Sequence, residues 1–415
     1  MIAARTSKAA TARAGSPQVV LALLCAVYLI VFVNRVNVAA VGPLIKSDLR
    51  LSNTQLGLAF SAFAIPYALF QLIGGWIGDK FGPRRTLAVC CVLIALATIL
   101  TGAAGGLSTL IAVRLAMGFA QGAVFPTATR AMSAWIPSET WGFAQGITHS
   151  FGRIGNAVTP PLMAALLLLV TWRRSFLILG LASLLWPLGW LWYVRDDPRG
   201  QPDSRSRASS QIPWLRLAWR MLPVTVVDFC YGWTLWLFLS WIPGFFYENY
   251  HLNLQSSALF SAGVLFAGVL GDTAGGILTD RLLRKTGNVL LARRSVIVAG
   301  FIGALAWLCP VVLIHNLALA ALGLSLAFFF AELIVGPIWA VSMDIAPRHA
   351  GTAGGMMNFG FGLAGLVSPS SFGYLVDRTG SWVLPFLCSM ALLLVGALLA
   401  WRLRPDRPFL EETIP

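Results

Sequence analysis

The sequence predicts an all-α membrane protein with twelve transmembrane helices in two pseudo-symmetric bundles of six. Hydrophobic residues make up 57% of the 415 residues and charged residues only 11%, far below the roughly one quarter that is usual in globular domains. Apolar runs recur along the whole chain, each close to the ~20 residues that a helix needs to cross a bilayer. Signatures in the first half of the chain also return in the second half.

The apolar runs place the spans in chain order. In the first half we expect helices near residues 18–41, 54–77, 86–105, 107–132, 140–170 and 174–194. In the second half we expect them near 221–247, 256–279, 292–314, 317–343, 350–376 and 381–401. The predicted organisation is therefore a tail (1–17), a first bundle (18–194), a linker (195–220), a second bundle (221–403) and a tail (404–415). The linker is expected because this segment is polar and rich in Pro, Ser and Arg.

The formal net charge of +14 is explained by the positions of the basic residues. Most of them fall in loops and tails that share one side of the membrane if the N-terminus is cytoplasmic, as the positive-inside rule requires. We therefore expect cytoplasmic termini, an inner (plasma) membrane location with the lipid bilayer as surroundings, and no nucleic-acid partner. No small-residue cleavage site follows the first apolar run, so we expect an anchored helix rather than a signal peptide.

Internal repeats support the division into halves. The segment GWIGDKFGPRR (75–85) is answered by GILTDRLLRK (276–285). Three residue pairs lie 201, 211 and 210 residues apart, and they are Asp79 and Asp280, Pro126 and Pro337, Trp172 and Trp382. Such similar separations indicate a duplication, and duplicated halves with a site between them are typical of transporters.

The repeated segment resembles the loop motif between helices 2 and 3 of the major facilitator superfamily. Asp79 is expected to accept hydrogen bonds from the N-terminus of a neighbouring helix. The basic residues at the cytoplasmic rim are expected to pair with facing carboxylates and to hold the halves shut on the inside. The alternative is a positive-inside anchor with a tight glycine turn. The gating residues predicted from this motif are Gly75, Asp79, Arg84, Arg85, Gly276, Asp280 and Arg281.

Four further blocks resemble the anion:cation symporter branch of that superfamily. They are NRVNVAAVGP, RLAMGFAQGAVFPTATRAMSAWIP, GITHSFGRIGNAVTPPL and residues 331–382, and the similarity covers nearly the whole chain. The resemblance implies alternating-access transport of a small organic anion, such as a sugar acid or another carboxylate, with protons as the coupling ion. Three positions depart from the family pattern. Asn34 and Gln121 replace usual acids, and Gly362 replaces a frequent Asn.

Arg35, Arg114 and Arg153 lie inside predicted spans. Charges at such depth usually face the bundle interior or a water-filled cavity, and a guanidinium can engage both oxygens of a carboxylate. Three arginines predict an electropositive cavity that attracts anions. The alternative is a structural arginine satisfied by carbonyls or by a buried acid. The predicted substrate-binding residues are Asn34, Arg35, Tyr67, Arg114, Gln121, His149, Arg153, Trp339 and Asn358.

Proton coupling needs a group that titrates, and the amides of Asn34 and Gln121 cannot. Glu332 and His149 are the candidates, because histidine titrates near neutral pH and a desolvated glutamate can approach it. Glu332 could equally be a structural acceptor or a salt-bridge partner. Asp272 is assigned to the inner gate.

The six cysteines lie inside predicted spans without metal-ligand spacing. We find no phosphate loop or nucleophile elbow, and we expect no cofactor and no enzyme activity. The expected oligomeric state is a monomer. Two other functions fit the same fold, namely a uniporter or exporter of an amphiphilic or siderophore-like solute, and a receptor that does not transport.

Overall fold

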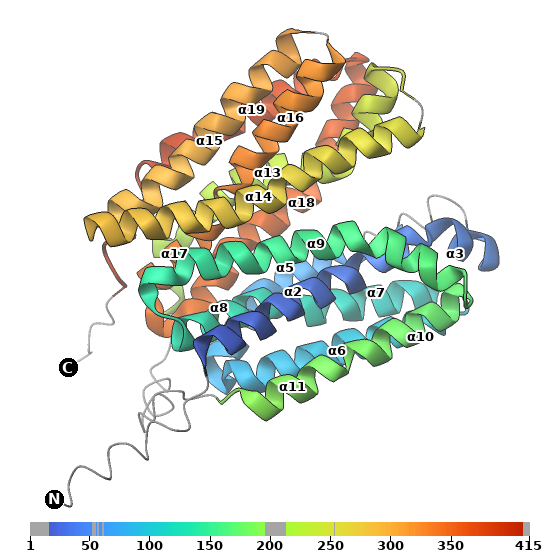
Figure 1. Ribbon diagram of the computed structural model, residues 1–415, viewed down its shortest axis with the longest axis horizontal. Helices are drawn as coiled ribbons and strands as arrows, with labels where there is room; N and C mark the ends of the chain where they lie inside the picture. Colours follow the sequence, from blue (N-terminus) through green and yellow to red (C-terminus); the bar gives the residue numbers. More distant parts are fainter. Residues whose placement is uncertain are drawn as a thin grey trace, which may run out of the picture.

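The computed structural model describes residues 16–51, 55, 58–59, 62–195, 213–252, 254–314 and 316–409. In this part of the chain two helical bundles pack against each other, the first coloured blue to green and the second yellow to red (Figure 1). The first bundle contains α2 (Pro17–Ala40), α3 (Gly42–Asp48), α5 (Ala64–Phe81), α6 (Pro83–Gly102), α7 (Leu107–Gly122), α8 (Val124–Trp135), η2 (Ser138–Thr140), α9 (Trp141–Leu167), α10 (Trp172–Ser183) and α11 (Leu185–Tyr193). The second contains α13 (Trp214–Asn249), α14 (Leu254–Thr286), α15 (Val289–Leu313), α16 (Leu317–Glu332), α17 (Val335–Ile345), η3 (Pro347–His349), α18 (Ala350–Thr379) and α19 (Val383–Ala400).

Three spans are each built from two consecutive helices, namely α7 with α8, α10 with α11, and α16 with α17. A proline removes a backbone N–H, and its ring clashes with the carbonyl four residues earlier. Each break lies four residues before a proline. The breaks are at Gly122 before Pro126, at Ser183 before Pro187 and at Leu333 before Pro337. With each pair counted as one span, the described helices confirm the predicted fold of twelve spans in two bundles.

The helices at the interface between the bundles differ in composition from the outer ones. Among the described residues, nine helical segments are long and apolar enough to cross a membrane. The three remaining long helices are α5, α9 and α18, which are rich in glycine and polar residues. These helices pack across the interface, α5 against α18 and α9 against α14. Their buried polar side chains, such as those of Gln71, Gln145 and Asn358, therefore face protein rather than lipid.

The ends of the second bundle differ from the sequence prediction. The predicted linker runs to residue 220, but α13 already begins at Trp214; residues 196–212 lie outside the described part. After α19 the chain turns back across the bundle end. The Arg220 side chain donates to the carbonyl oxygens of Arg404 and Arg407, and the Phe409 N–H donates to the Ile345 carbonyl at 2.6 Å. The predicted tail is thus packed against α13 and α17 up to residue 409.

Candidate anion-binding site

The site is built around Arg35, near the C-terminal end of α2. Its Nε donates to Oε1 of Gln121 at 2.9 Å, and Gln121 is itself anchored by donating from Nε2 to the Val31 carbonyl at 3.1 Å. The guanidinium carbon lies 4.6–5.5 Å from the centroids of four rings, those of Phe32, Phe63, Tyr67 and Phe125. Cation–π contacts stabilise the charge without neutralising it.

Arg114 on α7 places a second cation beside the first. Its side chain is buried, its Nη1 donates to the Arg35 carbonyl at 3.4 Å, and its guanidinium carbon lies 5.1 Å from the Phe63 ring centroid. The Phe63 ring is therefore in contact with both arginines. The structure brings together Arg35, Arg114, Gln121 and Tyr67, four of the residues predicted to bind the substrate.

Neither arginine is neutralised by an acid in the described part of the chain, where the ion pairs involve other residues. Arg35 Nη2 and Arg114 Nε are buried donors without a hydrogen-bond partner there. Buried donors are costly when unpaired, and two uncompensated cations repel each other. An anion between them would supply both the acceptors and the missing negative charge.

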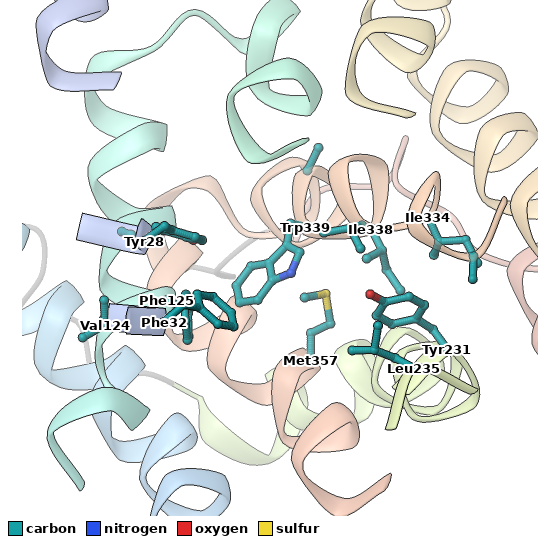
Figure 2. Close-up of a cluster of buried hydrophobic side chains, with 14 of the residues drawn as sticks. Tyr28, Phe32, Val124, Phe125, Tyr231, Leu235, Ile334, Ile338, Trp339 and Met357 are labelled. Atoms are coloured by element: carbon teal, nitrogen blue, oxygen red, sulfur yellow. The ribbon is translucent and has the colours of Figure 1, made fainter. Parts of the chain in front are cut away.

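An aromatic wall extends the site toward the second bundle. His149 on α9 packs against Tyr28, Phe125 and Trp339, with centroid distances of 5.1, 6.2 and 5.4 Å. Figure 2 shows Trp339 between the rings of the first bundle and the side chains of Met357 and Tyr231 in the second. His149 Nε2 is buried without a hydrogen-bond partner among the described residues. Asn358, one residue after Met357, is also buried.

Asn34 lies apart from this group. Its Nδ2 donates to the Ile30 carbonyl and to Ser183 Oγ at 2.8 and 2.9 Å, and its Oδ1 accepts from Thr98 at 2.7 Å. These bonds connect α2 with α6 and α10. Both N–H groups of the Asn34 side chain are used in them. In this structure Asn34 holds the first bundle together and has no donor left for a solute.

The environment of Arg153 also differs from the expected one. Its Nη2 donates to both oxygens of Glu332 at 3.0 Å, and its Nε lies 3.5 Å from Oδ2 of Asp272. Of the three arginines predicted to line an electropositive cavity, Arg35 and Arg114 have no acid beside them in the described residues, whereas Arg153 is paired with acids of the second bundle. Arg153 thus has the alternative arrangement, in which a buried acid satisfies the arginine.

Asp272 lies elsewhere than the sequence predicts. Because it precedes Asp280 by two turns, the sequence predicts a place at the inner gate. The structure packs it instead beside Glu332, fully buried. An acid inside a membrane span is by default a functional candidate, and that signal was present in the sequence.

The residues of the predicted gating motif join the two bundles at the end of the molecule where α2 begins and α19 ends (Figure 1). Both oxygens of Asp79, on α5, accept from the first residues of α18. The Gly351 N–H donates at 3.1 Å, and the N–H and hydroxyl of Thr352 donate at 2.6 Å each. A carboxylate at a helix N-terminus satisfies free N–H groups and the positive end of the helix dipole. A side chain of the first bundle thus caps a helix of the second.

The second copy of the motif makes the reciprocal contact. Asp280 on α14 accepts from the Gly142 and Phe143 N–H groups, at the start of α9 in the first bundle, at 3.1 and 2.5 Å. Arg293 connects Asp280 to Asp344, with N–O distances of 2.8 and 2.9 Å. The duplication seen in the sequence is therefore a duplication of this cap.

The glycines of the motif allow the close approach. A Cβ on Gly75 would lie 2.2 Å from the Gly351 carbonyl oxygen, and a Cβ on Gly276 would lie 2.3 Å from that of Gly142. Both distances are far below van der Waals contact. The atoms that would be met belong to the backbone, which cannot rotate away.

The rim arginines are arranged differently from the prediction. Arg84 donates to the Leu191 carbonyl at 2.6 Å, within its own bundle. The arginine that faces Asp79 is Arg130 on α8, whose Nε lies 3.5 Å from Asp79 Oδ1. Arg85 and Arg281 are exposed. Arginines do lie at this end, but the arginine that faces Asp79 comes from α8, which the motif does not include.

Comparisons with known proteins agree with this architecture. A family model described as the Major Facilitator Superfamily matches residues 24–369. The chain belongs to the Major Facilitator Superfamily. Members similar in sequence include the probable sulfoacetate transporter of Cupriavidus necator, which is 46% identical over 401 residues and 93% of each chain. The hexuronate transporter of Bacillus subtilis is 28% identical over 88% of this chain and 90% of its own.

Solved superfamily structures share the fold. A crystal structure of the transporter FucP in the outward conformation covers 92% of this chain and 98% of its own, with a TM-score of 0.71 and 16% identity. A proton:xylose symporter with bound 6-bromo-6-deoxy-D-glucose covers 92% and 94%, with a TM-score of 0.75 and 14% identity. This chain is therefore a transporter-type membrane protein of the superfamily and not an enzyme.

Proposed function

We propose that this protein takes up a small organic anion across the inner membrane by alternating access, together with protons. The observation that carries the proposal is the pair formed by Arg35 and Arg114. Two guanidiniums share the Phe63 ring, keep buried donors free and have no acid beside them in the described residues. A guanidinium suits carboxylate and other planar or tetrahedral oxyanions because its donors form a fork.

The relatives narrow the substrate class. The probable sulfoacetate transporter is 46% identical over nearly the full length, and more distant relatives are named for hexuronate and galactonate. Sulfoacetate carries two acid groups on a two-carbon frame, so one acid group for each arginine is a simple match. We therefore propose a small anion of this kind, with sulfonate and carboxylate groups, ahead of a sugar acid.

The gating caps support alternating access. Asp79 and Asp280 join the two bundles at one end through hydrogen bonds to helix N-termini, which can be released without breaking either bundle. With the N-terminus cytoplasmic, as the basic loops favour, this end is the inner one. In that orientation the structure is the state closed toward the cytoplasm.

Uptake into proteoliposomes tests the proposal. Wild-type protein is expected to accumulate radiolabelled sulfoacetate when the outside is acidic, with hexuronate and galactonate as weaker competitors. Arg35→Gln should reduce uptake at least tenfold, because a charge-assisted contact is worth about 1.5–3 kcal/mol. Arg174→Gln, at an exposed arginine in the same bundle, is the matched control and should transport normally.

Normal uptake by Arg35→Gln would contradict the anion-binding assignment. Transport of an uncharged or cationic amphiphile in preference to any organic anion would instead favour the exporter or uniporter reading. Absence of exchange for every anion in correctly inserted protein would contradict transport itself.

A further inference from the structure

A second charged cluster lies at the interface of the bundles, apart from the Arg35–Arg114 pair. It consists of Arg153 on α9, Tyr231 on α13, Asp272 on α14 and Glu332 on α16, and we call it the carboxylate-pair cluster. Arg153 belongs to the first bundle and its three partners to the second. The cluster is held by the Arg153–Glu332 contacts described above and by the Tyr231 hydroxyl, which donates to Glu332 Oε2 at 2.9 Å.

The two acids are unequally satisfied. Glu332 accepts from Arg153 on both oxygens and from Tyr231. Asp272 is equally buried, yet neither of its oxygens accepts a hydrogen bond from a donor in the described part of the chain. Its nearest cationic atom is Arg153 Nε at 3.5 Å. An ionised carboxylate in such a place is strongly disfavoured.

The charges of the cluster do not balance when both acids are ionised. Two carboxylates then face one guanidinium, which leaves one uncompensated negative charge inside the membrane. Both acids are held against the same guanidinium, since Arg153 Nε lies 3.5 Å from Asp272 Oδ2 and Arg153 Nη2 lies 3.0 Å from Glu332 Oε2, and a hydrogen bond between two such carboxyl groups requires one proton. One shared proton satisfies Asp272 and makes the cluster neutral, as in other carboxylate pairs that cannot both ionise.

The helices around the pair offer few other charged or titratable groups. His149 lies one turn before Arg153 on α9 and is directed into the aromatic wall. Asp228 lies one turn before Tyr231 on α13 and faces the backbone of Phe361 on α18. Ser150 and Thr273 bridge α9 and α14 with an O–O distance of 2.7 Å and carry no charge. Arg153 is thus the cation that faces the pair within the described residues.

We propose that Asp272 and Glu332 together bind the proton that is moved with the anion. This inference rests on the proposed function, because it names the carrier of the coupling ion. The proton binds a carboxylate oxygen of the pair from one side of the membrane and leaves the same pair to the other side, and no other bond changes. Asn34 and Gln121 cannot perform this step, since amides do not titrate in this range.

The position of the cluster gives the proton an effect on alternating access. Arg153 is the one member contributed by the first bundle, so the attraction across the interface depends on the charge of the second-bundle pair. Loss of the proton leaves two negative charges opposite Arg153 and strengthens that attraction. Proton binding weakens it, which makes separation of the bundles at this level easier.

The experiment compares two kinds of transport in proteoliposomes that contain the full chain. Exchange of labelled for unlabelled sulfoacetate requires no net proton movement, whereas accumulation driven by an acidic exterior does. In Asp272→Asn we expect exchange within about threefold of wild type, while acid-driven accumulation and substrate-driven proton entry, read by trapped pyranine, fall at least tenfold. Asp228→Asn, at a buried acid outside the cluster, is the control and should keep both.

Several outcomes would overturn the proposal. Acid-driven accumulation and proton entry at wild-type level in both Asp272→Asn and Glu332→Gln would do so. Wild-type accumulation driven by a sodium gradient without proton entry would do so as well. Normal exchange in the wild type, with accumulation that does not respond to an acidic exterior, would leave anion transport standing and refute this proton site, whereas absence of exchange would refute the proposed function.

If the variants fail to fold, the wild-type protein decides the question. Purified protein in weakly buffered detergent should take up about one proton when sulfoacetate binds at a pH where the pair is ionised. No proton uptake at any pH between 5 and 9, with binding confirmed by thermal shift, would contradict the proposal.

Discussion

Gln121 positions Arg35 without neutralising it, through a single hydrogen bond of 2.9 Å from Arg35 Nε to Gln121 Oε1. A carboxylate at this place would form an ion pair with the same nitrogen. The amide therefore leaves the positive charge of Arg35 available to a bound anion. The Arg35 side chain also stays in place, because Gln121 is anchored to the Val31 carbonyl.

The first prediction concerns this contact. Gln121→Glu should weaken binding of sulfoacetate about tenfold or more at neutral pH, because the new carboxylate competes with the anion for Arg35; tenfold corresponds to about 1.4 kcal/mol. Binding should recover as the pH falls and the glutamate becomes protonated. Calorimetric titration at two pH values measures the effect.

Gln121→Leu is the matched neutral variant. It removes the hydrogen bond but adds no charge, so its affinity should fall less and should lack the recovery at low pH. Equal losses in the two variants would mean that positioning of Arg35, rather than its charge, determines affinity.

The second prediction separates charge from geometry at Arg114. Arg114→Lys keeps the charge but loses the planar fork and the contact with the Phe63 ring, so we expect intermediate affinity. Arg114→Gln should lose binding at least tenfold. Thermal shift with sulfoacetate ranks the variants, and an order in which Gln binds better than Lys would contradict a role in anion binding.

The third prediction concerns the cap that Asp79 places on α18. Asp79→Ala removes acceptors for two N–H groups and one hydroxyl. Loss of a helix cap costs about 1 kcal/mol, so the population open at this end should rise about fivefold. Distances between spin labels at the exposed positions Arg85 and Lys285, one in each bundle, report the change.

Asp48→Asn provides the control for that measurement. Asp48 forms an exposed ion pair with Arg173 at 2.9 Å within the first bundle, and such pairs contribute little to stability. An unchanged distance distribution in Asp79→Ala would show that the cap does not determine the state of this end.

The fourth prediction uses the glycines. Gly75→Ala should abolish tight closure and lower both the melting temperature and transport, since the new Cβ would lie 2.2 Å from the Gly351 carbonyl oxygen. Gly263→Ala, on α14 with nothing within 4 Å of the new atom, should be neutral or stabilising, because alanine favours helix by up to ~1 kcal/mol. Equal melting temperatures of the two variants would argue against the close approach.

The features that follow from local chemistry could be predicted from the sequence. The spans follow from their length and apolar composition, and the break before Pro126 from the geometry of proline. The role of Asp79 as a cap was predictable because a carboxylate next to a glycine-rich helix end has few other uses inside a bundle.

The features that depend on contacts between distant segments could not be predicted. Arg153 meets Glu332 only because α9 packs across the interface against α14 and α17, next to the end of α16 that carries Glu332, and no pattern within either helix indicates this. The direction of Asn34, toward Ser183 rather than the site, depends on how α2 is rotated in the bundle. A one-residue rotation about a helix axis decides such a case.

The reciprocal arrangement of the two caps has an energetic consequence. Asp79 holds a helix of the second bundle and Asp280 holds a helix of the first, so opening this end requires that both contacts be lost. Their contributions add if the two sites act independently, as distant sites usually do. Damage to one cap alone should therefore shift the resting population only in part. A carrier that rests open at this end is expected only when both duplicated aspartates are removed together.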